Sequence, residues 1–94
     1  MIKPPTTQSV IAALRKAGLH MSSTYMSVSK CSDRIEVTFA NYYDHESRSL
    51  KPRVDTAAKI VDCLRAKGWA VQETLHSDKS YTLAVREEAP HGLA

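Results

Sequence analysis

Two segments of the chain have the apolar spacing of an amphipathic helix. From Thr7 to Ala17, apolar side chains recur at i, i+1, i+4 and i+7, and Thr6 or the next residue supplies a hydroxyl that can cap the first turn. The second helix is predicted to begin at Pro52, whose missing amide and fixed φ suit the first helical position. Gly18 and Gly68 each follow a helix directly, where a left-handed residue ends it. The buried stripe of the second helix is predicted to be Val54, Ala57, Ile60, Val61 and Leu64.

Other segments alternate apolar and polar side chains, which indicates strands with one covered face. They are residues 25–30, 34–40, 69–75 and 81–86. Short turn-like segments join them into two hairpins, and two hairpins side by side make a four-stranded, largely antiparallel sheet. The predicted fold is α+β, with both helices packed on the apolar face of this sheet. The open face is predicted to be polar, carrying Ser27, Ser29, Arg34, Glu36, Thr38, Gln72, Thr74, Thr82 and Arg86.

The second helix repeats the first. The sequence VIAALRKAGLHM, which begins at Val10, is matched by IVDCLRAKGWAV, which begins 50 positions later at Ile60. The likeness predicts one domain over residues 1–94, built from a helix-strand-strand unit used twice (αββαββ). The copies occupy residues 6–40 and 52–86, residues 41–51 link them, and residues 87–94 form a loose tail.

The linker, NYYDHESRSLK, fits neither the helical nor the strand period. It is predicted to be an irregular connection, and because it is longer than connections in compact domains usually are, it is either functional or partly an extension of the second strand through Tyr43. Loops on a rigid scaffold often carry recognition, and tyrosine and arginine are enriched at interaction hot spots. The alternative is that the tyrosines only cap the sheet edge while the charges are solvated. The candidate partner-binding residues are Tyr42, Tyr43, Asp44, His45, Arg48, Lys51 and Arg53.

Composition adds a second hypothesis about the partner. The 94 residues are 43% hydrophobic and 24% charged, as in an ordinary soluble domain, and 13 Lys and Arg against 10 Asp and Glu permit weak attraction to polyanions. Nucleic acid is therefore the alternative partner, with Arg34 and Arg86 as candidate phosphate contacts. Base stacking on the sheet is not expected, because Phe39, Trp69 and Tyr81 are predicted on the helix-covered face.

The sequence carries no catalytic signature, so the protein is predicted not to be an enzyme and to need no cofactor. The metal-ligating types Asp44, His45 and Glu46 are consecutive and cannot converge on one ion. The first ten residues lack the apolar core of a signal peptide, and no run is long enough to cross a membrane, which predicts a cytoplasmic protein. A free sheet edge leaves both a monomer and a homodimer open.

The segments LRKAG, RIEVTFANYY, AKIVDCLRAKGWAV and YTLAVRE, spread over residues 10–87, resemble small α/β proteins of unknown function encoded by phages of actinobacteria. The resemblance implies a phage accessory protein that acts in the host cytoplasm, and it assigns no catalytic residues. The leading hypothesis is a non-enzymatic module that binds a host or viral macromolecule, with a protein as the expected partner.

Overall fold

Residues 3–19 and 25–87 are described in the computed structural model of the 94-residue chain. Four of the strands form one antiparallel sheet, so the predicted α+β class with two helices and a four-stranded antiparallel sheet is confirmed. The other two strands form a second, two-stranded sheet. Along the chain the order is α1 (Thr7–Lys16), β1 (Met26–Lys30), β2 (Ile35–Phe39), β3 (Tyr42–Asp44), β4 (Ser49–Lys51), α2 (Val54–Arg65), β5 (Ala70–Leu75) and β6 (Tyr81–Arg86).

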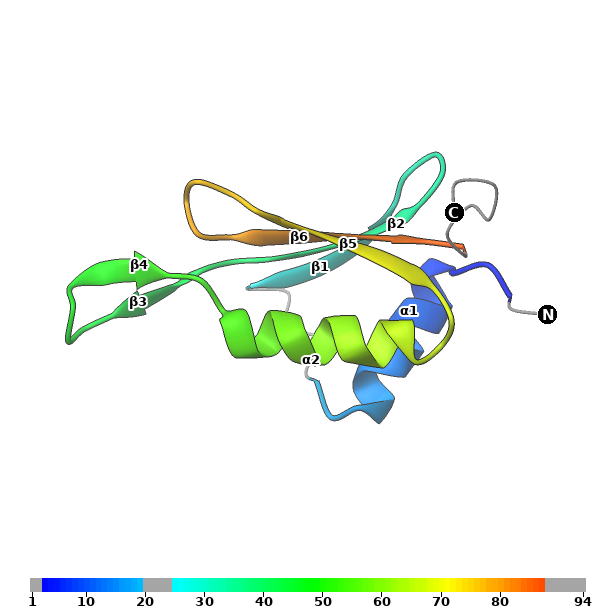
Figure 1. The fold of residues 1–94 in the computed structure, drawn as a ribbon, viewed down its shortest axis with the longest axis horizontal. Coiled ribbons are helices and arrows are strands. Elements are labelled where there is room, and N and C mark those ends of the chain that lie inside the picture. Colours follow the sequence, from blue (N-terminus) through cyan, green and yellow to red (C-terminus); the bar gives the residue numbers. More distant parts are fainter. Residues whose placement is uncertain (1–2, 20–24, 88–94) are drawn as a thin grey trace, which may run out of the picture.

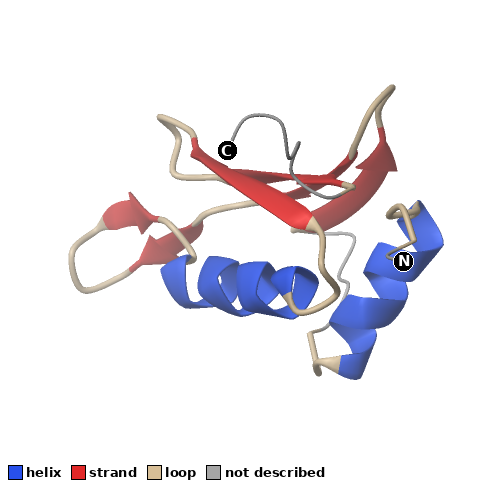
Figure 2. Ribbon diagram, turned by 45° about the vertical axis from the view of Figure 1, so that its right-hand side comes forward, coloured by secondary structure: helices blue, strands red, loops and turns tan. Residues whose placement is uncertain are grey.

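The four-stranded sheet has the order β1-β2-β6-β5, so its two central strands come from opposite halves of the chain. β2 and β6 pair with Val37 opposite Leu83, and both side chains are fully buried. Burial alternates along both strands, so apolar side chains point toward the helices seen below the sheet in Figures 1 and 2. The pairing places the polar side chains on the other face, from Ser27 in β1 to Thr74 in β5.

Both helices contribute side chains to one hydrophobic core with the strands. Where the helices meet, the thiol of Cys63 donates a hydrogen bond to the carbonyl oxygen of Ala13 over 3.3 Å. Trp69 is buried, and its indole N–H donates to the carbonyl oxygen of Lys3 over 2.7 Å, which ties the start of the described chain to the segment after α2. The buried residues of the helices are Val10, Ala13 and Leu14 in α1 and Ala57, Ile60, Val61 and Leu64 in α2.

The helix ends follow from the local sequence. The Thr6 hydroxyl accepts a hydrogen bond from the Ser9 amide over 3.0 Å, and the Ser9 hydroxyl accepts one from the Thr6 amide over 2.8 Å, so α1 begins with a reciprocal cap. Gly18 and Gly68 follow the two helices with φ of 81° and 88°. Their amides donate to the carbonyl oxygens three residues earlier over 3.0 and 2.9 Å, which satisfies groups that the helix ends leave open.

The start of α2 differs from the prediction. Arg53 is its N-cap and Val54 its first residue, so Pro52 lies before the helix and not at its first position. Val54 was predicted in the buried stripe, but 56% of it is exposed because the first turn borders an open groove and not the core. At the end of the other stripe, Ala17 is exposed because α1 stops at Lys16.

Residues 42–51 form a β-hairpin, and we call this hairpin the arm. β3 and β4 pair antiparallel with each other and belong to neither edge of the main sheet. Figure 1 shows the arm projecting from one end of the body, which is the rest of the described chain. The molecule is elongated accordingly, with extents of 47 × 28 × 22 Å. The segment is thus neither an irregular connection nor a continuation of β2, which ends at Phe39.

Candidate binding surface

The turn of the arm is held by its own polar side chains. The Asp44 carboxylate accepts hydrogen bonds from the Ser47 hydroxyl over 2.8 Å and from the Glu46 amide over 3.2 Å. These hydrogen bonds, that of Ser47 first, hold the pKa of Asp44 below its usual value. Arg48 adopts a left-handed φ of 53°, which reverses the chain into β4. Asp44 and Arg48, both predicted to contact a partner, therefore help to shape the turn.

The pairing of β3 with β4 gives the arm two faces. Tyr43 lies opposite Leu50 on one face, while Tyr42 lies opposite Lys51 on the other. We call these the Tyr43–Leu50 face and the Tyr42–Lys51 face. The ring of His45 meets the ring of Tyr43 edge-on, with 4.9 Å between centroids and an interplanar angle of 76°. Tyr43 and Leu50 are 49% and 47% exposed, so an apolar cross-strand pair faces outward.

Arg53 fastens the base of the arm to the body. Its Nε donates a hydrogen bond to the carbonyl oxygen of Ala40 over 3.0 Å. Its guanidinium carbon lies 4.7 Å from the ring centroid of Tyr25 and 5.6 Å from that of Tyr42, in cation–π range of both rings. Asn41 also donates from its side-chain amide to the carbonyl oxygen of Asp78 in the β5–β6 turn. The arm is thus mounted in one orientation, and the guanidinium of Arg53 serves that mounting.

A shallow groove runs between the Tyr42–Lys51 face of the arm and the first turn of α2. Its volume is about 440 Å³. Tyr42 and Val54, which are 42% and 56% exposed, offer apolar surface in it, and Lys51 is among the residues that line it. An exposed aromatic side chain with further apolar surface beside it and a polar rim is typical of a protein interface. The lining residues are Tyr42, Lys51, Pro52, Arg53, Val54, Asp55 and Thr56.

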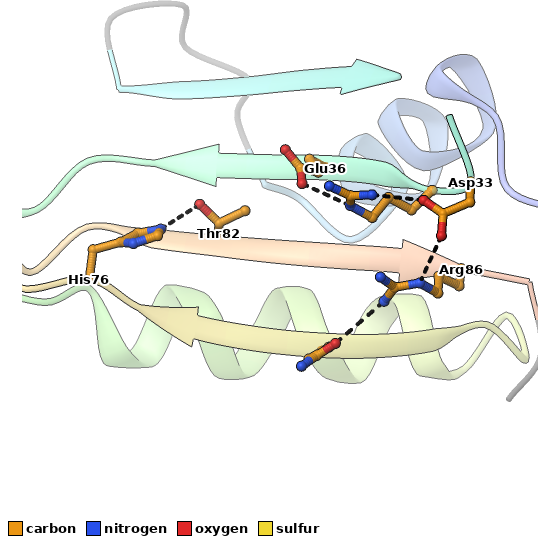
Figure 3. A network of polar contacts seen from close by, with 7 residues as sticks. Asp33, Glu36, His76, Thr82 and Arg86 are labelled. Atoms are coloured by element: carbon orange, nitrogen blue, oxygen red, sulfur yellow. Dashed lines mark hydrogen bonds and ion pairs between the residues drawn. The ribbon is translucent and has the colours of Figure 1, made fainter. Parts of the chain in front are cut away.

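The two predicted phosphate contacts, Arg34 and Arg86, lie on the open face of the main sheet, where carboxylates already hold them (Figure 3). Arg34 pairs with Asp33 over 2.7 Å and with Glu36 over 2.9 Å. Arg86 lies 3.7 Å from the second oxygen of Asp33 and also reaches Gln72 over 3.4 Å. We call this set the sheet-face network. Its two cations and two carboxylates cancel in charge, and a phosphate would have to displace the carboxylates.

The protonation states fit this pairing. The hydrogen bond from Arg34 lowers the pKa of Asp33, and Asp33 in turn raises the pKa of Arg34. Farther along the same face, the Nε2 atom of His76 lies 2.8 Å from the Thr82 hydroxyl. Side chains on the open face thus bind one another across strands.

Within residues 3–19 and 25–87, no three His, Cys, Asp or Glu residues cluster as metal ligands would, and both cysteines are free thiols. None of the helices there is long and apolar enough to cross a membrane. Phe39, Trp69 and Tyr81 are buried in the core, away from the open sheet face. A stack of nucleic-acid bases on that face would not find these aromatic rings.

Two exposed residues, Leu50 and Val54, are not among the candidate partner-binding residues that the sequence predicts. Leu50 was assigned to an irregular segment, although it is a lone large apolar residue between Ser49 and Lys51. Val54 was assigned to the core because it continues the helical period of α2. The periodicity does not reveal that this period extends one turn beyond the core, so only the three-dimensional arrangement exposes Val54.

No protein-family model matches the chain, and no curated protein is similar to it. The fold and the exposed residues of the arm are therefore the observations from which a function can be inferred.

Proposed function

We propose that the protein is a non-enzymatic binding module that contacts a host or viral protein through the groove beside the arm. It would act in the host cytoplasm, as the resemblance of its sequence to phage accessory proteins implies. The observation that carries the proposal is the exposure of Tyr42 and Val54 in one groove, next to Lys51. A partner segment would place an apolar side chain between Tyr42 and Val54 and a carboxylate near the ammonium group.

The mounting of the arm supports this role. Tyrosine offers a large contact area with few rotatable bonds, and its contribution to binding grows when its position is fixed beforehand. Arg53 holds the ring of Tyr42 in place from the body side, so the partner would not have to order it. The groove is thus prepared for binding without a folding step.

A protein is favoured over nucleic acid by the distribution of charge. Arg34 and Arg86 are neutralised in the sheet-face network. In the groove, Asp55 offsets part of the positive charge of Lys51 and Arg53, which leaves little net attraction for an extended phosphate backbone. Binding to nucleic acid would instead require a surface on which basic groups stand without acidic neighbours.

We also infer that the body is one helix-strand-strand unit used twice, with both helices on the apolar face of the sheet. In support, Cys63 and Ala13, which stand 50 positions apart in equivalent places of the repeat, meet where the helices contact each other. In the sheet, Val37 at the middle of β2 pairs with Leu83, one of the two middle residues of β6. The arm belongs to neither copy, so a function that is not repeated in the two copies should lie there.

A capture experiment tests the proposed function. The immobilised protein is exposed to a lysate of the host, beside Val54→Glu and Leu75→Glu variants. Val54→Glu puts a charge into the groove at the first residue of α2, where an acidic side chain does not weaken a helix. Leu75 in β5 is a matched control, since it is 49% exposed and outside the groove.

We expect the wild-type protein and Leu75→Glu to retain the same partner protein and Val54→Glu to lose it. Equal capture by all three would contradict the groove as the site. Retention of nucleic acid without any protein would replace the proposal by the nucleic-acid alternative.

A further inference from the structure

A second cavity lies beside α1, at the end of the body away from the arm (Figure 1). Its volume of about 360 Å³ is within the range of small-molecule sites. Ala12 and Ala13 have side chains too small to fill the space on this face of the helix, which leaves the cavity open. The apolar residues that line it are Pro4, Ala12, Ala13 and Trp69. A compact hollow with an apolar lining suits a small ligand better than the flat surface of a protein.

The walls of this cavity are tied to one another. The indole N–H of Trp69 donates to the carbonyl oxygen of Lys3 over 2.7 Å, so the segment before α1 is fixed to the segment after α2. On the helix side, Ala13 accepts a hydrogen bond from the thiol of Cys63, which fixes α1 to α2. A ligand would therefore enter a cavity whose walls are already in place, and binding would cost little ordering of the protein.

The charge around the cavity has one sign. Three lysines line it from three segments, namely Lys3 before α1, Lys16 in the last turn of α1 and Lys67 after α2. Among the described residues that line it there is no Asp or Glu, whereas Asp55 lines the groove beside the arm. The first turn of α1 also has no acidic residue, so the positive end of its helix dipole, next to Thr6 in the lining, adds to this charge. We call this hollow the lysine cavity, and its charge selects an anion.

We propose that the lysine cavity binds a small organic anion with an aromatic body, such as an aryl carboxylate. The aromatic ring would pack between the indole of Trp69 and the ring of Pro4, where it is removed from water. The carboxylate would pair with the lysine ammonium groups at the rim in charge-assisted hydrogen bonds. This proposal concerns a different part of the molecule from the groove beside the arm and does not rest on the function proposed for that groove.

An NMR titration with naphthalene-1-acetate and with its neutral amide, naphthalene-1-acetamide, tests the proposal. Trp69 is the one tryptophan of the chain, so its indole N–H gives a single signal that reports directly on the cavity. We expect the acid to shift this signal to saturation, the amide to bind several-fold more weakly, and added salt to weaken only the acid. Absence of a saturable shift up to the solubility limit of the acid, or equal affinities for acid and amide, would overturn the proposal.

A pair of alanine variants tests the location. Ala12 and Ala58 are both exposed on helices, but only Ala12 lines the lysine cavity. Ala12→Glu should abolish binding of the acid, because it fills the cavity and adds a like charge, while Ala58→Glu should bind as the wild type does. Equal affinities of the two variants would show that the acid binds elsewhere. Val54→Glu should also bind the acid unchanged, so failure of the groove proposal is separable from failure of this one.

The lysines are tested by removing their charge. Lys16→Gln and Lys67→Gln should each lower the affinity for the acid several-fold and leave that for the amide unchanged. Lys59→Gln is the matched control, since Lys59 is exposed in α2 and outside the cavity. Thermal melting establishes that each variant is folded. Equal weakening of acid and amide, or the same affinity for the acid in all three variants, would contradict the pairing of the lysines with the anion.

Discussion

The body and the arm are held together by different interactions. The body is stabilised by a continuous core in which Leu83 and Val37 are fully buried at the centre of the sheet. The arm has an exposed apolar pair, a turn held by polar hydrogen bonds, and one arginine at its base. The difference implies that the body supplies stability while the arm, which contributes little to it, is available for recognition.

The largest expected difference in stability between the two regions comes from one kind of substitution, leucine to alanine, made once in the body and once in the arm. Leu83→Ala should destabilise the protein by about 3 kcal/mol, because a fully buried leucine leaves a cavity in the core. Leu50→Ala, in the exposed centre of the arm, should change the free energy of unfolding by less than about 0.5 kcal/mol. Urea denaturation measures both. Similar losses in the two variants would show that the arm is part of the stabilising core.

The next effect concerns the junction of the two regions. Arg53→Lys keeps the charge but loses the planar guanidinium that reaches Tyr25, Tyr42 and the carbonyl of Ala40. We expect a loss of about 1 kcal/mol that is confined to the arm. Hydrogen exchange should quicken at residues 42–51 and stay unchanged in β2 and β6. Uniformly faster exchange in both regions would mean that the arm unfolds only together with the body.

Substitutions at residues with a left-handed backbone should lower the free energy of unfolding by about 1 kcal/mol or more in the body but not in the arm. Gly18→Ala should destabilise the body by roughly 1 kcal/mol, since its φ of 81° is strained for alanine even though open space surrounds the new Cβ atom. Gly68→Ala, at a φ of 88°, should lose roughly 1 to 2 kcal/mol. Arg48→Gly should be neutral or slightly stabilising, because it relieves the same strain in the arm. Thermal melting checks all three, and unchanged melting of both alanine variants would rule out the glycines as shared helix caps.

The smallest effect is a pH response of the arm. The folded-state pKa of Asp44 lies below its unfolded value, chiefly because of the Ser47 hydrogen bond. Its contribution is therefore present above the unfolded pKa and is lost as the pH falls through the folded one. Exchange of the turn amides should quicken on acidification in the wild type, and Asp44→Asn should remove this response. An unchanged response in Asp44→Asn would assign it to another group.

The body could largely be predicted from the sequence because its signals are local. Five alternating residues define β2, and a glycine after each helix marks its end. The same local signals fail at the arm, where each strand has three residues, too few to show a period. Its mounting depends on contacts between distant residues, such as Asn41 with Asp78 and Arg53 with Tyr25.

The predicted surface residues show the same limit. The sequence identifies Arg34 and Arg86 as candidate phosphate contacts, but whether they are free to bind a phosphate depends on which side chains the fold places beside them. Arg34 and Arg86 meet across β2 and β6 through Asp33, and this pairing is invisible in the sequence. Tyr42 and Lys51 remain exposed or half exposed at the groove. The predictions for Tyr43 and His45 stay predictions, although the structure brings their rings together.

The claim that the body is stable without the arm is tested most directly by shortening the arm. Tyr42 and Lys51 are cross-strand partners, so residues 43–50 can be replaced by Asn-Gly, which closes a two-residue hairpin turn between them. Chemical denaturation of this variant should show one cooperative transition with a free energy of unfolding within about 1 kcal/mol of the wild type. Loss of the cooperative transition, or destabilisation of about 3 kcal/mol as expected for a core residue, would contradict the claim.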